Sequence, residues 1–268
     1  MERTAVTICV VNYKTLDFTR LCLRSIRKFS SNYPYEVIVV DNNSADASLE
    51  YLRSLKWIRL IERKEKDQSG GHAHGNALDL GLANCNTEFF VSMHSDTFVH
   101  QDGWLNDLLS YFNDDENIAC VGSGKLELTP RLLVWFKKIT DYRTAWRKLL
   151  RKPDPTDIYR YYSRTICSLY RTEILKKHNL SFAKGKGSGF TVGKKLFFEL
   201  VDNDYKTIDL PDWKMSKYVW HLAHASAVFD IADEYRRKNT ENKCGKRLKK
   251  IMDSEVIWSI VNDESLDK

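Results

Sequence analysis

The sequence FFVSMHSDTF, at residues 89–98, places a carboxylate directly after an apolar run. The run is almost continuously apolar rather than alternating, which is typical of a strand covered on both faces in a parallel sheet. Sheets of this kind bind ligands beyond the carboxyl ends of their strands. Asp96 would meet a polyphosphate or a Mg²⁺ or Mn²⁺ ion there, since these ions favour oxygen ligands. The alternative is a solvated turn, because Asp and Ser favour turns.

Two earlier apolar runs also end in polar residues. Val6–Val11 precedes Asn12, and Glu36–Val40 precedes Asp41. Two further apolar runs follow, at Ile58–Ile61 and in the segment 89–98. Helical patterns separate the four runs, so four strands alternate with three helices. This alternation predicts an α/β fold with a Rossmann-like, mostly parallel sheet and helices on both faces. In such a sheet the polar strand ends fall along one edge, and Asp96 becomes a neighbour of Asn12 and Asp41.

A glycine pair, Gly70 and Gly71, begins the third predicted helix. Backbone at a glycine-rich helix start can approach a phosphate, which the partial positive charge of the helix end favours. His74 and Asn76 follow within the first turns and are candidate donors to such a phosphate. The segment has the spacing of neither the GxGxxG fingerprint nor a P-loop, so a simple helix-start turn is the alternative.

The composition is that of a globular protein with one large domain, or with one domain and an appended piece. The chain has 268 residues and a net charge of +6, too small for the domain-wide basic stripe expected of a nucleic-acid-binding protein. Nowhere do about 20 apolar residues follow one another, and the amino terminus lacks a signal-peptide pattern, so we expect a cytoplasmic protein. Six cysteines without CxxC spacing indicate buried, reduced thiols rather than a zinc site or a disulfide framework.

Basic residues concentrate in two segments. Arg131–Lys152 carries Trp135 and Trp146 among many lysines and arginines, which predicts a basic amphipathic helical insertion. Such a helix makes peripheral contact with a membrane carrying anionic lipids, or packs as an ordinary amphipathic helix on the core. Membrane association of the protein depends on the first alternative. Residues 231–268 predict a basic, mostly solvated C-terminal helical tail.

Four segments, VVNYKT, VVDNNS, GGHAHGNALDLGLANC and MHSDTFVHQDGWLNDLL, resemble in their order the family 2 glycosyltransferases with the GT-A fold. The resemblance covers Thr7–Ser226. It implies a GT-A domain over 1–230, with a nucleotide-binding half at 1–125 and an acceptor-side half at 126–230. It further implies metal-assisted, inverting transfer of a sugar from a nucleotide-diphosphate-sugar donor to a glycan or lipid-linked acceptor, with Mn²⁺ or Mg²⁺. A non-catalytic relative that binds a nucleotide or a carbohydrate is the alternative.

The resemblance also assigns roles to single residues. Asp41 would contact the nucleotide base, and Asp96 would be the last carboxylate of the family's DXD motif. His94 stands where the first acidic residue is usual, so the motif reads HSD. The metal ligands implied are Asp96, His224 and His221, with His224 preferred to His221. The donor-binding residues expected are Asn12, Asp41, Asn43, Gly71, His74, Asn76, His94, Ser95 and Lys186.

The catalytic base is the weakest part of the match. Inverting members carry an acidic pair ahead of a helix, and here that position holds Val192 and Gly193. Asp212 and Asp209, which flank the end of the next predicted strand, are the expected catalytic residues, with Asp212 preferred. Lys186 lies in a glycine- and lysine-rich loop that is either a lid over the diphosphate or a linker.

Overall fold

The computed structural model describes residues 6–65, 70–124, 162–185, 190–222 and 251–268, with isolated positions between 238 and 249. The strands of the main sheet are β1 (Val6–Asn12), β2 (Tyr35–Asp41), β3 (Arg59–Glu62), β4 (Phe89–His94), β6 (Ile118–Gly122), β7 (Cys167–Arg171) and β8 (Lys206–Asp209). A second sheet pairs β5 (Thr97–Val99) with β9 (Val219–His221). The helices are α1 (Leu16–Phe29), α2 (Ala47–Ser54), α3 (Gly70–Ala83), α4 (Trp104–Ser110), α7 (Thr172–Lys177), α8 (Lys194–Asp202), α9 (Asp212–Met215), α11 (Glu255–Val261) and the 3-10 helix η2 (Glu264–Asp267).

The main sheet has seven strands in the order β3-β2-β1-β4-β7-β6-β8. Strand β7 runs antiparallel to both of its neighbours, and the other pairings are parallel. The predicted mostly parallel sheet is therefore confirmed. Because the parallel strands share one direction, their carboxyl ends meet along one edge, and this edge carries the polar strand ends.

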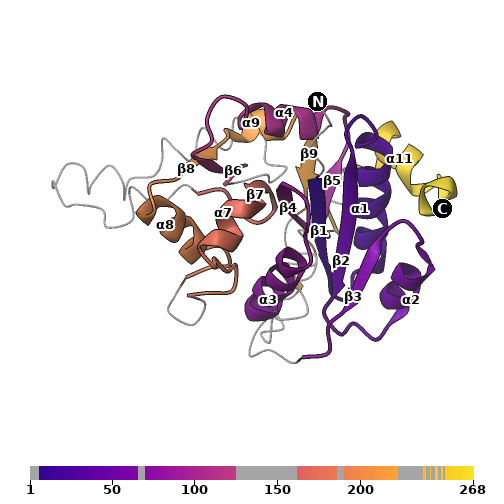
Figure 1. Cartoon of the computed structure of the whole chain (residues 1–268). Coiled ribbons are helices and arrows are strands. Elements are labelled where there is room, and N and C mark those ends of the chain that lie inside the picture. The colour runs from indigo at the N-terminus through magenta and orange to yellow at the C-terminus, as the bar shows by residue number, and fades with distance from the viewer. Residues whose placement is uncertain are drawn as a thin grey trace.

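Helices cover both faces of the sheet. Along β1, Ile8 and Val10 point toward α1, and Cys9 and Val11 point toward α3, as the two-residue period of a strand requires. Figure 1 shows α1, α2 and α11 on one side of the sheet and α3, α7 and α8 on the other. Burial on both faces explains why the strands read as continuous apolar runs.

The end of the chain packs on the main domain. α11 lies against α1 (Figure 1), and Ile251, Ile257 and Ile260 are at most 3% exposed within the same core as α1. Of the predicted basic tail, this last part thus packs on the domain through these isoleucines, while other side chains such as Trp258, 64% exposed, face solvent. The predicted division at residue 230 falls between described segments and stays a prediction.

Several expectations concern residues outside the described ranges. The basic amphipathic insertion at Arg131–Lys152 is one of them, and Lys186 and His224 are others. Five of the six cysteines are described, and these five are buried and unpaired, as predicted. Within the described part of the chain, no helix combines the length and the apolar character that crossing a bilayer requires.

Candidate metal centre

The polar residues that end three adjacent strands lie side by side. The parallel register pairs Asn12 with Asp41 and Val11 with His94, on β1, β2 and β4. Ser95 and Asp96 form the turn between β4 and β5, and they are 6% and 5% exposed. The predicted meeting of strand ends at one edge is therefore confirmed for this group.

Asn12 is the centre of a buried hydrogen-bond network. Its Nδ2 donates to Asp41 Oδ1 at 2.6 Å, to Ser48 Oγ at 2.9 Å and to Ser44 Oγ at 3.1 Å. Its Oδ1 accepts from Thr19 Oγ1 at 2.7 Å. Asp41 also accepts from the backbone nitrogen and the hydroxyl of Ser44, and it is 1% exposed. Both predicted residues thus brace the edge of the sheet, through hydroxyl partners that sequence reasoning did not find.

The loop after β2 is held in a strained conformation. Ala45 has a φ angle of 49°, in the left-handed region that an alanine rarely adopts, and Asn43 has a φ angle of 59°, which an asparagine tolerates better. Ser44 between them is buried and accepts a hydrogen bond from the backbone nitrogen of Lys14 at 3.0 Å. Strain of this kind persists only where surrounding contacts impose it, and it clusters at ligand sites. Asn43 is exposed at the tip of this loop.

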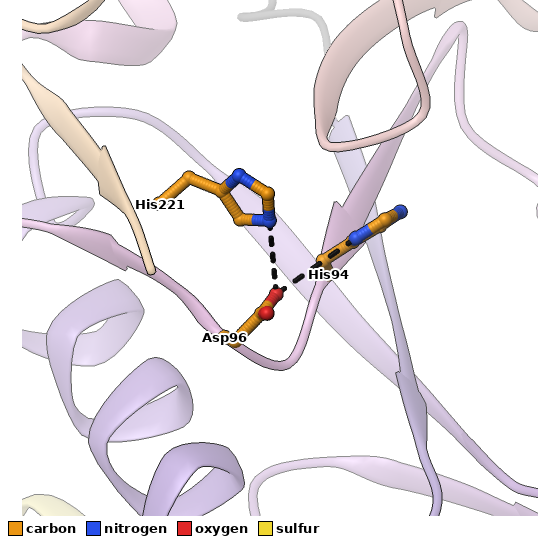
Figure 2. A group of neighbouring side chains, drawn as sticks. All are labelled: His94, Asp96 and His221. Atoms are coloured by element: carbon orange, nitrogen blue, oxygen red, sulfur yellow. Dashed lines mark ion pairs between the residues drawn. The ribbon is translucent and has the colours of Figure 1, made fainter. Parts of the chain in front are cut away.

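Asp96 lies between two imidazoles. Its Oδ1 is 3.2 Å from His221 Nε2 and 3.8 Å from His94 Nδ1. Figure 2 shows the two rings approaching this oxygen, one from the end of β4 and one from β9. The distance between Asp96 Oδ1 and His221 Nε2 is short enough for a hydrogen bond, but the two groups are not oriented to form one. Both ring nitrogens of His221 are buried without a hydrogen-bond partner among the described residues.

A third imidazole belongs to the same cluster. The ring of His74 on α3 packs edge-on against His94, with 4.6 Å between the ring centroids. Desolvation lowers the pKa of His74 to about 4, against the attraction of Asp96. The pKa of His94 also lies well below its ordinary value, chiefly because the ring is desolvated and secondly because of Coulomb repulsion from His74. At neutral pH both rings are therefore neutral, the form that can bind a metal ion.

The cluster fits a divalent cation. One donor atom each from His94, Asp96 and His221 can be chosen so that all lie within 4.8 Å of one another. The second nitrogen of His94, Nε2, lies 3.3 Å from Thr165 Oγ1. A ligating histidine commonly makes such a contact through its other nitrogen, which fixes the ring. His221, whose buried ring nitrogens have no hydrogen-bond partner among the described residues, supplies the third donor atom of this candidate metal centre.

The first turns of α3 carry the other predicted donor-binding residues. Gly71 and Asn76 are half-buried there, on the helix that brings His74 to the cluster. Gly75 allows this helix to approach another segment, because a Cβ at this position would lie 2.6 Å from Ala183 Cα.

Asp79, also on α3, holds the start of the glycine- and lysine-rich loop. It accepts hydrogen bonds from Ser181 Oγ at 2.6 Å and from the backbone nitrogens of Phe182 and Ala183 at 2.7 and 3.3 Å. Burial raises the pKa of Asp79, although these hydrogen bonds favour its ionised form. Sequence reasoning missed this residue, since an acidic residue in a helix usually faces solvent.

The predicted catalytic residues lie further along the same edge. Asp209 ends β8 and pairs with Gly122 of β6. Across the next two strand pairs, β6 with β7 and β7 with β4, the residue in line with it on β4 is Ser92. At about 4.8 Å per strand, about 14 Å separate Asp209 from β4. Burial, followed by repulsion from Asp212, raises the pKa of Asp209, and a hydrogen bond from the backbone of Gly124 opposes this effect. Asp212 is exposed as the first residue of α9.

Arg164 is a cation between these groups that the sequence prediction did not include. It is exposed, and its positive charge influences both His94 and Asp209 by Coulomb interaction. An arginine among candidate phosphate-site residues offers a rigid fork of donors that suits a phosphate. Its position just before β7, after the long segment that lies outside the described residues, gave no sequence signal.

Comparison with known proteins identifies the family of this architecture. The family model described as Glycosyl transferase family 2 matches residues 7–178. The curated protein "Putative glycosyltransferase EpsH" of Bacillus subtilis (strain 168) is 24% identical over 133 residues, 50% of this chain and 38% of that protein. The match thus spans less than half of that relative's length.

Solved structures show the same fold. A mannosyltransferase, PcManGT from Pyrobaculum calidifontis in complex with GDP-Man and Mn²⁺, aligns with 97% of this chain and 79% of its own, at 16% identity and a TM-score of 0.56. S. aureus TarS in complex with UDP-GlcNAc aligns with 92% of this chain and 72% of its own, at 16% identity and a TM-score of 0.53. The predicted GT-A fold is thereby confirmed.

Proposed function

This chain belongs to glycosyl transferase family 2, and we propose that it transfers a sugar from a nucleotide-diphosphate-sugar donor to a hydroxyl of a glycan or lipid-linked acceptor. The observation that carries the proposal is the convergence of His94, Asp96 and His221 at the edge where the strands end. Neighbouring GT-A structures with GDP-Man and Mn²⁺ or with UDP-GlcNAc support a nucleotide sugar as donor. Such a reaction belongs to glycan biosynthesis.

The residues of this edge divide the work of binding the donor. Asn12 and Asp41 hold the loop after β2 in place, and we assign the nucleoside to the surface that this loop presents. His94, Asp96 and His221 would hold a divalent cation, with Ser95, Gly71 and Asn76 beside the diphosphate. When bound, a divalent cation stabilises the negative charge that develops on the departing diphosphate. Arg164 adds a second positive charge for the same leaving group.

Inverting transfer also needs a base that takes the proton of the attacking acceptor hydroxyl. We assign this role to Asp209 or Asp212, at the end of β8. The raised pKa of Asp209 suits a base, since a carboxylate that binds a proton more readily accepts one more readily. The assignment predicts that Asp209→Asn and Asp212→Asn differ, with the larger loss of kcat identifying the base.

A non-catalytic relative that binds a nucleotide or a carbohydrate is the second candidate. Val192 and Gly193 favour it, because no carboxylate stands ahead of α8 where inverting members carry an acidic pair. The two candidates differ in donor cleavage. A binding protein would bind the donor without releasing nucleoside diphosphate, with or without an acceptor.

The test is a panel of GDP- and UDP-sugars, scored for binding by thermal shift and for release of nucleoside diphosphate. A ligand that binds only the folded state must raise its melting temperature. Asp96→Asn should remove the metal-dependent part of the shift and the donor cleavage. Asp204→Asn is the matched control, because Asp204 is exposed and has a φ of 62°, which Asn tolerates well. Binding and cleavage that survive Asp96→Asn would contradict the proposed site.

A further inference from the structure

The candidate metal centre is rich in nitrogen donors. Its described side chains include one carboxylate, Asp96, and two imidazoles, His94 and His221, with the third imidazole of His74 packed against His94. Hard ions such as Mg²⁺ favour carboxylates, carbonyls and water, whereas imidazole suits Zn²⁺, Cu²⁺, Fe²⁺ and Ni²⁺. The donor set is therefore better matched to a transition metal than to Mg²⁺.

We propose that this site selects a transition-metal ion over Mg²⁺, with Co²⁺ and Zn²⁺ bound more tightly than Mn²⁺, and that His94 is the residue that sets this preference. The inference rests on the proposed function only in locating the ion at the donor site. It concerns which ion the residues of this chain accept.

The geometry prepares both imidazoles for an ion. The contact of His94 Nε2 with Thr165 Oγ1 at 3.3 Å leaves Nδ1 on the side of Asp96. The side chain of His221 is 6% exposed, and its nitrogens have no hydrogen-bond partner within the described ranges. A buried polar group without a partner is costly, and binding an ion through its lone pair removes that cost.

The charge of the cluster argues against Mg²⁺. Among the described side chains of the cluster, one carboxylate faces two imidazoles, so the cluster offers less negative charge to a cation than paired carboxylates would. Mg²⁺ gives up its bound water reluctantly and relies on charged oxygens to replace it. Transition-metal ions instead bind more tightly when imidazoles are among the ligands. Co²⁺ and Zn²⁺ both bind such a site more tightly than Mn²⁺ does. Oxygens of a nucleoside diphosphate would add to the affinity for each of these ions.

The test measures ion binding to the full chain directly. Protein stripped with a chelator is titrated with MgCl₂, MnCl₂, CoCl₂ or ZnCl₂ by calorimetry, and bound Co²⁺ is followed by its visible absorption, whose position and intensity depend on the ligands and on the coordination geometry. We expect Co²⁺ to bind at least about tenfold more tightly than Mg²⁺, since ligand type sets this preference. Equal affinity for the two ions would overturn the proposal.

Substitutions identify the residues responsible. His94→Asp should bring the Mg²⁺ affinity closer to the Co²⁺ affinity and weaken the visible absorption. Thr165→Val leaves every ligand in place and should still lower Co²⁺ affinity about 10- to 100-fold, as loss of a contact behind a ligand does. His178→Asn is the control, because His178 contacts Tyr205 away from the cluster. An unchanged preference in His94→Asp would overturn the role of His94, and the melting curve of each variant in chelator verifies its folding.

The outcome separates this inference from the proposed function. Titrations are repeated with GDP and UDP at saturating Co²⁺. Ion selectivity without nucleotide binding would contradict the proposed glycosyl transfer and support the selectivity. Nucleotide binding together with equal affinity for Mg²⁺ and Co²⁺ would support the proposed glycosyl transfer and contradict the selectivity.

Discussion

Arg24 Nε donates to Asp267 Oδ1 at 2.9 Å, and Arg24 Nη2 donates to Asp267 Oδ2 at 2.6 Å. This contact joins α1 to the last turn of the chain, and Tyr51 of α2 donates to the same carboxylate at 2.8 Å. Burial opposes the ionisation of Asp267, but the hydrogen bonds from Arg24 and Tyr51 hold its pKa below the ordinary value of 3.8. The carboxyl end of the chain is thus fastened to the helical layer formed by α1 and α2.

Asp267→Asn should lower the free energy of unfolding by about 1–3 kcal/mol at neutral pH, the usual cost of breaking a hydrogen bond to a charged group. Because the folded pKa is lowered, the unfolded state binds more protons as the pH falls through 3.8. The stabilisation by Asp267 is therefore full at neutral pH and is lost in acid. Urea denaturation at neutral pH and at a pH below the folded pKa should show a difference in the free energy of unfolding between wild type and variant that is smaller in acid.

The control for this experiment is Asp253→Asn, at an exposed position ahead of α11. It should leave stability at neutral pH nearly unchanged. A loss in Asp267→Asn that is equally large below its folded pKa would show that the contact acts through packing rather than through charge.

Much of the fold could be predicted from the sequence, because the physics that sets it is local. Apolar runs such as Val6–Val11 end in polar residues, and the helical patterns between them force parallel crossovers. The meeting of Asn12, Asp41 and His94 then follows from direction alone, without knowledge of a single contact. The family resemblance added the roles, since strand ends by themselves name no ligand.

The rest depends on contacts between segments far apart in the chain. Asp79 has the pattern of a surface helix residue, and only the folded chain brings the backbone of Phe182 to it. Arg164 enters the edge through the antiparallel strand β7, whose register no local pattern reveals. The basic composition around residue 250 conceals Ile257 and Ile260, which are fully buried beside α1.

Asp79→Asn should loosen the start of the glycine- and lysine-rich loop. An amide keeps one acceptor where the carboxylate accepts from Ser181, Phe182 and Ala183, so a backbone donor is left without its partner. We expect a loss of about 1–3 kcal/mol in stability and faster amide hydrogen exchange at 181–185. Asp202→Asn, at the exposed end of α8, is the control and should change neither. Unchanged exchange at 181–185 in Asp79→Asn would contradict the anchoring role.

Gly81→Ala should destabilise the contact between α3 and β1. A Cβ at Gly81 would lie 2.3 Å from Cys9 Sγ, and Cys9 is fully buried in a central strand. Alanine would otherwise gain about 1 kcal/mol in a helix interior, but overpacking a rigid core costs about 1–3 kcal/mol. A net loss of stability is expected. Cys9→Ala in the same background should recover part of it, so a double-mutant cycle without coupling would refute the steric explanation.

Arg164→Ala should weaken use of the donor without unfolding the protein. Arg164 is exposed, and its charge acts on His94 and Asp209, which lie at opposite ends of the proposed site. Losing a hydrogen bond to a charged phosphate costs about 1.5–3 kcal/mol, which lowers kcat/KM by about 10- to 100-fold. Arg164→Lys keeps the charge but loses the planar fork, so it should recover only part of the activity.

The matched control is Arg59→Ala, because Arg59 is an exposed arginine that bonds to Asn84 at the other end of the sheet. It should leave kcat/KM unchanged. If Arg164 holds the leaving diphosphate rather than the intact donor, kcat should fall with KM nearly constant, since only transition-state stabilisation is lost. A rise in KM alone would assign Arg164 to ground-state binding, and equal kinetics in Arg164→Ala and Arg59→Ala would remove it from the site.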